Sequence, residues 1–171
     1  MSVNMKQVQP PTRHTDRIGF PWDLTEWADS DSLRQWIQQD IDSFDWGNPL
    51  LVQYLQTHPR YRPKMLLTLL LYAYATGVYA SEDIAEQCYG APTFRSICGP
   101  TAPSAPEIEK FRRENRGLLK RGLQQILIRS LRKHFSLGDG LLPPGLRPHV
   151  ENAALTRLDL ARHLDRSAQA A

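Results

Sequence analysis

The feature that most constrains the fold is an apolar stretch that a proline opens and a glycine closes. Pro63 is favoured in the first turn of a helix, and Gly77 tolerates the positive φ that often follows the last turn. The spacing predicts a helix over 64–76. Its residues leave almost no polar face, which predicts burial at the centre of the fold. The apolar run 65–75 is far shorter than the roughly 20 residues that a membrane span requires, so none is expected.

Apolar residues at helical spacing predict further helices before and after this one. One follows Ser30 as its N-cap, a shorter one opens at Pro49 and ends before Pro59, and another follows Ser81 as its N-cap and ends near Gly90. The buried stripe of the first is expected to contain Leu33, Trp36, Ile37, Ile41 and Phe44. We place Tyr72 and Tyr74 in the core as well.

The second half of the chain adds a single turn, a long helix and a C-terminal helix. The turn begins at Thr93, and Cys98 is placed in the loop after it. Ser104 and Glu107 have the spacing of a capping box and open one long helix that continues through residue 133. The fold class is therefore all-α, with about six helices around helix 64–76. The predicted divisions are an irregular arm (1–28), a helical domain (29–136), a linker rich in Pro and Gly (137–150), and a C-terminal helix with a tail (151–171).

The net charge of +3 conceals a strong asymmetry along the chain. Residues 1–57 have a net charge of −4, 58–109 of −1, and 136–171 of zero, whereas 110–135 carry nine basic side chains against one acid. The nine are Lys110, Arg112, Arg113, Arg116, Lys120, Arg121, Arg129, Arg132 and Lys133. Such a concentration of positive charge indicates a polyanionic partner and carries no information about the fold.

On one long helix, four of these cations would project together over about two turns. Arg112, Arg113, Arg116 and Lys120 lie at steps of three and four residues, opposite the apolar stripe. Phosphate contact is one interpretation of this face. The other is a solvated surface that pairs with the acidic N-terminal region. Bases could be read by Asn115, Glu114 or Arg116, and the pattern does not choose among them.

Other reactive residue types do not form recognisable sites. Cys88 and Cys98 are separated by ten residues with no histidine nearby, so a zinc site is improbable, and two cysteines cannot build a disulfide scaffold. The five histidines are scattered. No secretory signal is recognisable at the N-terminus, so we expect a reduced, cytoplasmic protein without cofactor or metal.

Four motifs occur in a particular order along the chain. They are Tyr61-Arg62-Pro63-Lys64-Met65-Leu66-Leu67, Tyr72-Ala73-Tyr74-Ala75-Thr76-Gly77, Ser81-x-x-Ile84-Ala85-x-x-Cys88 and Ile108-x-x-Phe111-Arg112-Arg113. Over residues 45–130 this order resembles the helical N-terminal domain of bacterial insertion-sequence transposases of the InsH type. The resemblance implies recognition of transposon ends, with the helices at Ser81 and at Phe111 in a helix-turn-helix-like unit.

In that family, this domain precedes a ribonuclease-H-like domain with an Asp-Asp-Glu triad that uses divalent metal. Too few residues follow Phe135 for such a domain, and Asp139 lies among Gly and Pro without a strand pattern, as expected of a turn residue. The chain is therefore expected not to be an enzyme by itself. Glu107 also departs from the family, which usually has a small hydroxyl residue there, and an acid would repel phosphate at the start of that helix.

The sequence supports two hypotheses about function. The first is binding of double-stranded DNA, with transposon ends as the target that the resemblance implies, by Lys110, Arg112, Arg113, Arg116, Lys120 and Arg121, with Arg62 and Lys64 at the start of helix 64–76. The second is a helical interaction module. It would associate with itself or with a full-length transposase through the apolar stripe of 118–131 or the C-terminal helix.

Overall fold

The computed structural model describes residues 19–44, 49 and 62–171, and in these residues the protein is all-helical. A 3₁₀ turn, η1 (Leu24–Glu26), precedes the helices α1 (Ser30–Asp42), α3 (Pro63–Ala75), α4 (Ser81–Gly90), α5 (Pro92–Cys98), α6 (Ala105–Glu114), α7 (Arg116–His134) and α8 (Arg147–Ala170). The described part contains no strand, only an isolated bridge between Asp23 and Thr76. The predicted all-α class is confirmed.

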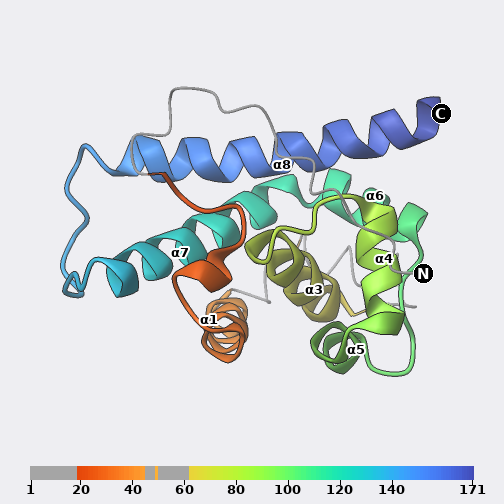
Figure 1. Cartoon of the computed structure of the whole chain (residues 1–171), viewed down its shortest axis with the longest axis horizontal. Coiled ribbons are helices and arrows are strands. Elements are labelled where there is room, and N and C mark those ends of the chain that lie inside the picture. Colours follow the sequence, from red (N-terminus) through yellow and green to blue (C-terminus); the bar gives the residue numbers. More distant parts are fainter. Residues whose placement is uncertain (1–18, 45–48, 50–61) are drawn as a thin grey trace, which may run out of the picture.

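Helix α3 lies at the centre of the molecule, as its apolar sequence predicts. It contacts α1, α5, α6 and α7, which surround it in Figure 1. Leu69, Leu70, Leu71 and Tyr74 are fully buried, and Tyr72 is nearly so. Pro63 stands in its first turn, and Gly77 follows it with a φ of +83°. The predicted helix 64–76 is therefore confirmed within one residue at each end.

Helix α1 packs its apolar stripe against α3 and α7. The predicted N-cap Ser30 is wrong by one residue, because Asp29 caps the helix and its Oδ1 accepts the Ser32 N–H at 2.8 Å. Leu33, Ile37 and Ile41 are fully buried, whereas Trp36 is only half-buried. The shorter helix predicted from Pro49 lies mostly outside the described residues.

Two predictions around α4 and α5 are wrong. Ser81 is the first helical residue of α4 rather than its cap, and Ala80 occupies the cap position without a side-chain bond. The Ser81 N–H and hydroxyl donate instead to Asp165 of α8, at 2.8 and 2.7 Å. Cys98 is the buried last residue of α5 rather than part of a loop. Gly99 ends α5 with a φ of +65°.

The predicted long helix is in fact two helices, which meet at Asn115. The capping box that opens α6 is present, since the Glu107 carboxylate accepts the Ser104 N–H at 2.8 Å. The backbone of Asn115 leaves helical geometry with φ −120° and ψ 29°, while its side-chain amide donates to the Phe111 carbonyl at 3.0 Å. The axis therefore changes between α6 and α7, and cations on the two helices do not form one continuous face.

Helix α8 runs back along α7 in Figure 1. It begins at Arg147, inside the segment predicted as a linker, and packs Val150, Ala154 and Leu158 inward. The described part of the predicted arm, residues 19–28, also packs on the helices, with Phe20 and Leu24 buried; residues 1–18 lie outside the described part. No described helix has both the length and the apolarity to cross a membrane.

Candidate nucleic-acid interface

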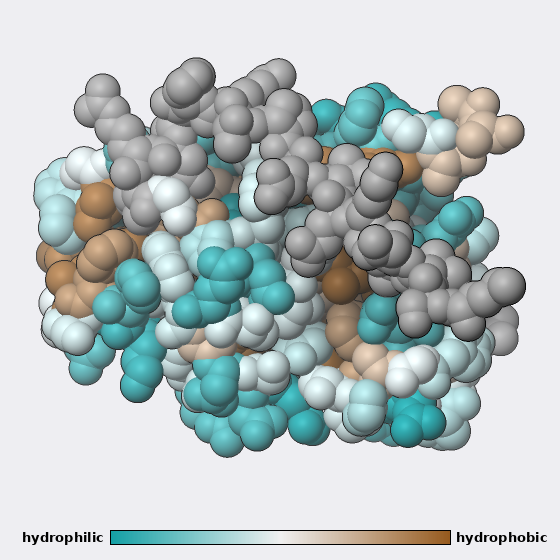
Figure 2. Space-filling model, in the orientation of Figure 1, coloured by the Kyte–Doolittle hydropathy of each residue, from teal (hydrophilic) through white to brown (hydrophobic). Residues whose placement is uncertain are grey.

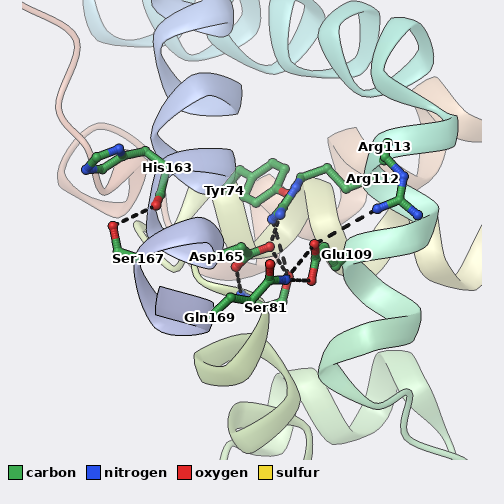
Figure 3. A network of polar contacts seen from close by, with 9 residues as sticks. All are labelled: Tyr74, Ser81, Glu109, Arg112, Arg113, His163, Asp165, Ser167 and Gln169. Atoms are coloured by element: carbon green, nitrogen blue, oxygen red, sulfur yellow. Dashed lines mark hydrogen bonds and ion pairs between the residues drawn. The ribbon is translucent and has the colours of Figure 1, made fainter. Parts of the chain in front are cut away.

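Arg112, a predicted DNA contact, faces the interior of the protein. Its side chain is only 6% exposed and forms an ion pair with Asp165, which is 5% exposed. A second nitrogen of the guanidinium lies 3.3 Å from the Ser81 hydroxyl and 3.5 Å from the Tyr74 hydroxyl (Figure 3). The Arg112 side chain is therefore withdrawn from solvent in this structure, and its contact with DNA stays a prediction. Arg112 lies on the side of α6 that faces the core, where its guanidinium pairs with the Asp165 carboxylate and does not reach a phosphate in solvent.

The same buried cluster affects a neighbouring tyrosine. Burial raises the pKa of Tyr74, and the nearby charge of Arg112 opposes that rise. Four elements supply the cluster: α3 gives Tyr74, α4 gives Ser81, α6 gives Arg112 and α8 gives Asp165 (Figure 3). Its chemistry is that of a buried charge pair with hydrogen-bonding neighbours, which stabilises a fold only while both partners are present.

Arg116 and Lys120 extend toward α8 and pair with its acidic residues. Arg116 Nη2 lies 2.8 Å from Asp159 Oδ1, and Lys120 Nζ lies 2.5 Å from Glu151 Oε1. The side chains of both pairs are between 32% and 51% exposed. Exposed pairs of this kind contribute only about 0–1 kcal/mol, so an incoming phosphate can compete for these cations.

The cations of α6 and α7 that extend into solvent are Lys110, Arg113, Arg121 and Lys133. Lys110 and Arg113 are three residues apart on α6 and therefore share a face. Arg113 lies 4.0 Å from Glu109 and remains 69% exposed. The Arg121 guanidinium lies over the ring of Phe44, two residues after the end of α1, at 5.4 Å. These four residues are the part of the basic segment that is open to a ligand without any rearrangement.

The predicted contacts at the start of α3 lie on the surface. Arg62 is exposed at the N-cap, and Lys64 is half-exposed with Nζ 3.6 Å from Asp42 Oδ1. Of the three candidates for base reading, Asn115 is buried and occupied by its bond to the Phe111 carbonyl. Arg116 is paired as described above, and Glu114 is exposed.

The two cysteines lie in contact, which the sequence did not indicate. The Cys98 thiol donates to the Cys88 sulfur across 3.1 Å, and both side chains are buried between α4 and α5. This hydrogen bond lowers the pKa of Cys88 and raises that of Cys98. Within the described residues, no three His, Cys, Asp or Glu side chains are grouped as a metal site would need.

A match to a protein-family model bears on the resemblance to transposases. The model of the transposase domain family DUF772 matches residues 23–114, more than half of the chain. The chain belongs to this transposase domain family. Searches of curated proteins and of solved structures found no match. The matched range of the transposase domain covers α1 through α6, whereas α7 and α8 lie beyond it.

Sequence reasoning missed the acidic side of this interface. Glu151, Asp159 and Asp165 all lie on α8 and engage Lys120, Arg116 and Arg112 in that order. Glu151 and Asp159 directly follow the buried apolar residues Val150 and Leu158, so a signal for these two acids was present in the helical pattern. The overall charge balance of residues 136–171 concealed it.

Proposed function

We propose that this transposase domain binds double-stranded DNA, with transposon ends as its targets, and that α6 and α7 supply the phosphate contacts. The proposal assigns no strand cleavage to the domain. Family membership supports it, as does the resemblance of the four motifs to the InsH type. The observation that carries it is the set of four exposed cations on α6 and α7: Lys110, Arg113, Arg121 and Lys133.

The electrostatics favour phosphate as the ligand. Residues 110–135 hold nine basic side chains and one acid, and only Arg112 among the nine is fully withdrawn from solvent. Arg116 and Lys120 form weak pairs with α8 that a polyanion can displace. Each phosphate that these cations neutralise contributes about −0.9 to the slope of log affinity against log salt. Affinity from such contacts is independent of sequence.

A helix-turn-helix-like role for α4 and α6 is part of the proposal. The two helices pack against each other, and α6 carries Lys110 and Arg113 on its exposed side. Arg62 and Lys64 would add contacts from the start of α3, if the DNA extends that far.

The test compares two triple variants of equal charge. In the first, Lys110, Arg113 and Arg121 are replaced by Glu; in the second, the exposed Arg34, Arg95 and Arg166 are replaced by Glu. We expect the first variant to lose affinity for a 30-base-pair duplex and to show a salt slope that is less steep by up to about 3. The second should bind with a nearly unchanged slope. Equal losses in both variants would contradict the assignment to α6 and α7.

The alternative interaction module loses the surface on which it was based. The apolar stripe of α7 packs inside the chain, with Leu119, Leu123 and Ile126 fully buried. The corresponding stripe of α8 is buried against it. The burial of these residues favours DNA binding over the interaction module.

A further inference from the structure

An open hollow lies at the C-terminal end of α7, where α1 and the connection to α8 approach it. Its volume is about 620 Å³. Three cations of α7 line it, Arg129, Arg132 and Lys133, together with Trp36 of α1 and Asp139 of the connection. The hollow is distinct from the α6 cations Lys110 and Arg113, which do not line it.

Two of its cations, Arg129 and Arg132, make hydrogen bonds to neighbouring residues of the chain. Arg129 donates to Gln39 Oε1 at 2.9 Å and to Asp40 Oδ1 at 2.7 Å. One guanidinium nitrogen of Arg132 donates a hydrogen bond to the Gly140 carbonyl at 2.5 Å. Burial raises the pKa of Asp40, while the charge of Arg129 opposes that rise. The two guanidinium groups are thus positioned before any ligand arrives.

Arg132 has an unsatisfied donor. Its Nε atom is buried and has no hydrogen-bond partner in the described part of the chain. Because this atom is closed to solvent, it is not itself a contact for a ligand in the hollow. Arg132 also lines a second hollow of about 440 Å³ between α7 and the start of α8, so it is approachable from two sides.

The charge balance of the hollow is positive, and its wall includes an aromatic ring. Three cations face two acids, Asp139 and the Asp40 that pairs with Arg129. Trp36 was expected in the core, yet it is half-buried and lines the hollow. An indole ring beside Arg and Lys is the combination that binds a nucleic-acid strand with an unstacked base, since the cations take the phosphate and the ring takes the base.

We propose that this hollow binds a nucleotide of an unpaired DNA strand, with its phosphate at Arg132 and Lys133 and its base against Trp36. The site rests in part on the proposed function, because it makes the DNA-binding domain selective for frayed or single-stranded ends. Two exposed apolar side chains of the α7–α8 connection lie near the site: Leu137 lines this hollow, and Leu141 lines the second one. Figure 2 shows hydrophobic surface at this end of the molecule.

The experiment measures binding of the full chain to two labelled single strands of equal charge. One is a twelve-nucleotide oligothymidine, and the other has the same phosphates without bases. We expect the chain to bind the strand with bases about fivefold or more tightly, because stacking contributes about 1–3 kcal/mol per base. Trp36→Leu should remove most of that difference. Equal binding of both strands by the unaltered chain would overturn the proposal.

The phosphate contact is tested by Lys133→Glu against Arg34→Glu, a matched change on an exposed arginine of α1. Lys133→Glu should weaken binding of both strands severalfold more than Arg34→Glu does. Asp139→Asn, which removes the carboxylate of the hollow, should strengthen it. All three variants change exposed residues, so folding is expected to persist, and circular dichroism checks this.

The outcomes separate this inference from the proposed function. If the Lys110, Arg113 and Arg121 variant loses duplex binding while Lys133→Glu and Trp36→Leu bind single strands normally, the hollow is wrong and the proposed function stands. If the triple variant binds duplex normally but Lys133→Glu and Trp36→Leu lose single-strand binding, the hollow stands and the assignment of duplex binding to Lys110, Arg113 and Arg121 fails.

Discussion

The Arg112 guanidinium of α6 and the Asp165 carboxylate of α8 form a buried ion pair that ties the two helices together. Asp165 also accepts two hydrogen bonds from Ser81 at the start of α4. One carboxylate therefore connects three helices. The C-terminal helix is joined to the family-matched part of the chain by charge as well as by apolar packing.

Removal of Asp165 should destabilise the protein strongly. Asp165→Ala leaves the Arg112 charge buried without a partner, which costs about 3–5 kcal/mol. Urea unfolding followed by circular dichroism measures the change in the free energy of unfolding. The double variant Arg112→Met with Asp165→Leu should recover only the part of the loss that comes from the unpaired charge, because the buried Ser81 N–H and hydroxyl still lack their acceptor. A loss below about 1 kcal/mol for Asp165→Ala would contradict a buried, paired Arg112.

Local sequence signals were sufficient for the elements whose ends depend on their own residues. Helix α3 followed from Pro63, Gly77 and the apolar run between them, and the opening of α6 followed from Ser104 and Glu107. In each case the decisive interactions lie within a few residues along the chain. The choice of Asp29 over Ser30 as the cap of α1 was not fixed in this way, because both residue types cap helices well.

The errors at the candidate site depend on partners that are distant in sequence. Whether Arg112 faces solvent depends on Asp165, which no spacing rule connects to it. The end of α6 at Asn115 is a local exception: it is accompanied by a side-chain bond to the Phe111 carbonyl four residues earlier, which a helical pattern with continuous apolar spacing does not reveal. The pairing of Arg116 and Lys120 required knowledge that α8 returns along α7.

A close contact between α3 and α7 predicts a glycine that does not tolerate substitution. A Cβ added at Gly122 would lie 2.5 Å from Leu71 Cδ1 and 2.9 Å from Leu71 Cδ2, and Leu71 is fully buried. We expect Gly122→Ala to cost about 1–3 kcal/mol in unfolding free energy through overpacking. Gly117→Ala is the control on the same helix. It has no neighbour within 4 Å and should gain about 0.5–1 kcal/mol from helix propensity.

The buried Tyr79 should make the protein sensitive to alkali. Burial raises the pKa of Tyr79 to about 12, against about 10 for an unfolded chain. The unfolded state therefore loses this proton first, so stability falls as the pH rises from about 10 to about 12, by on the order of 2–3 kcal/mol. Urea unfolding at pH 8, 10 and 11 measures the fall.

Two tyrosine variants control this prediction. Tyr79→Phe loses the hydrogen bond to the Trp22 carbonyl, worth about 1 kcal/mol at pH 8, but should show a shallower alkaline decline. The exposed Tyr89 should not matter, so Tyr89→Phe should decline like the unaltered chain. An unchanged decline in Tyr79→Phe would assign the effect to other groups.

The contact between Cys88 and Cys98 should allow an intramolecular disulfide. With diamide as the two-electron oxidant, the Cys88 thiolate adds to the N=N bond of the reagent. The Cys98 sulfur then attacks the Cys88 sulfur, which forms the S–S bond, breaks the S–N bond and releases the hydrazine with both electrons and both protons. We expect the monomer mass to fall by two hydrogens and alkylatable thiols to be lost in denaturant. Dithiothreitol should reverse both changes. Cys98→Ser should form no such product, and thiols that stay titratable in the unaltered chain would contradict the contact.

Neutralising the acids of α8 should strengthen DNA binding if Arg116 and Lys120 contact phosphate. Glu151→Gln and Asp159→Asn remove the carboxylates that compete for these cations, and each exposed pair is worth about 0–1 kcal/mol. The double variant should therefore bind a duplex up to about tenfold more tightly at low salt. Glu26→Gln with Asp31→Asn removes two exposed acids that are not the partners of Arg116 and Lys120 and is the matched control. An equal gain in the control would show that net charge, rather than release of Arg116 and Lys120, sets the affinity.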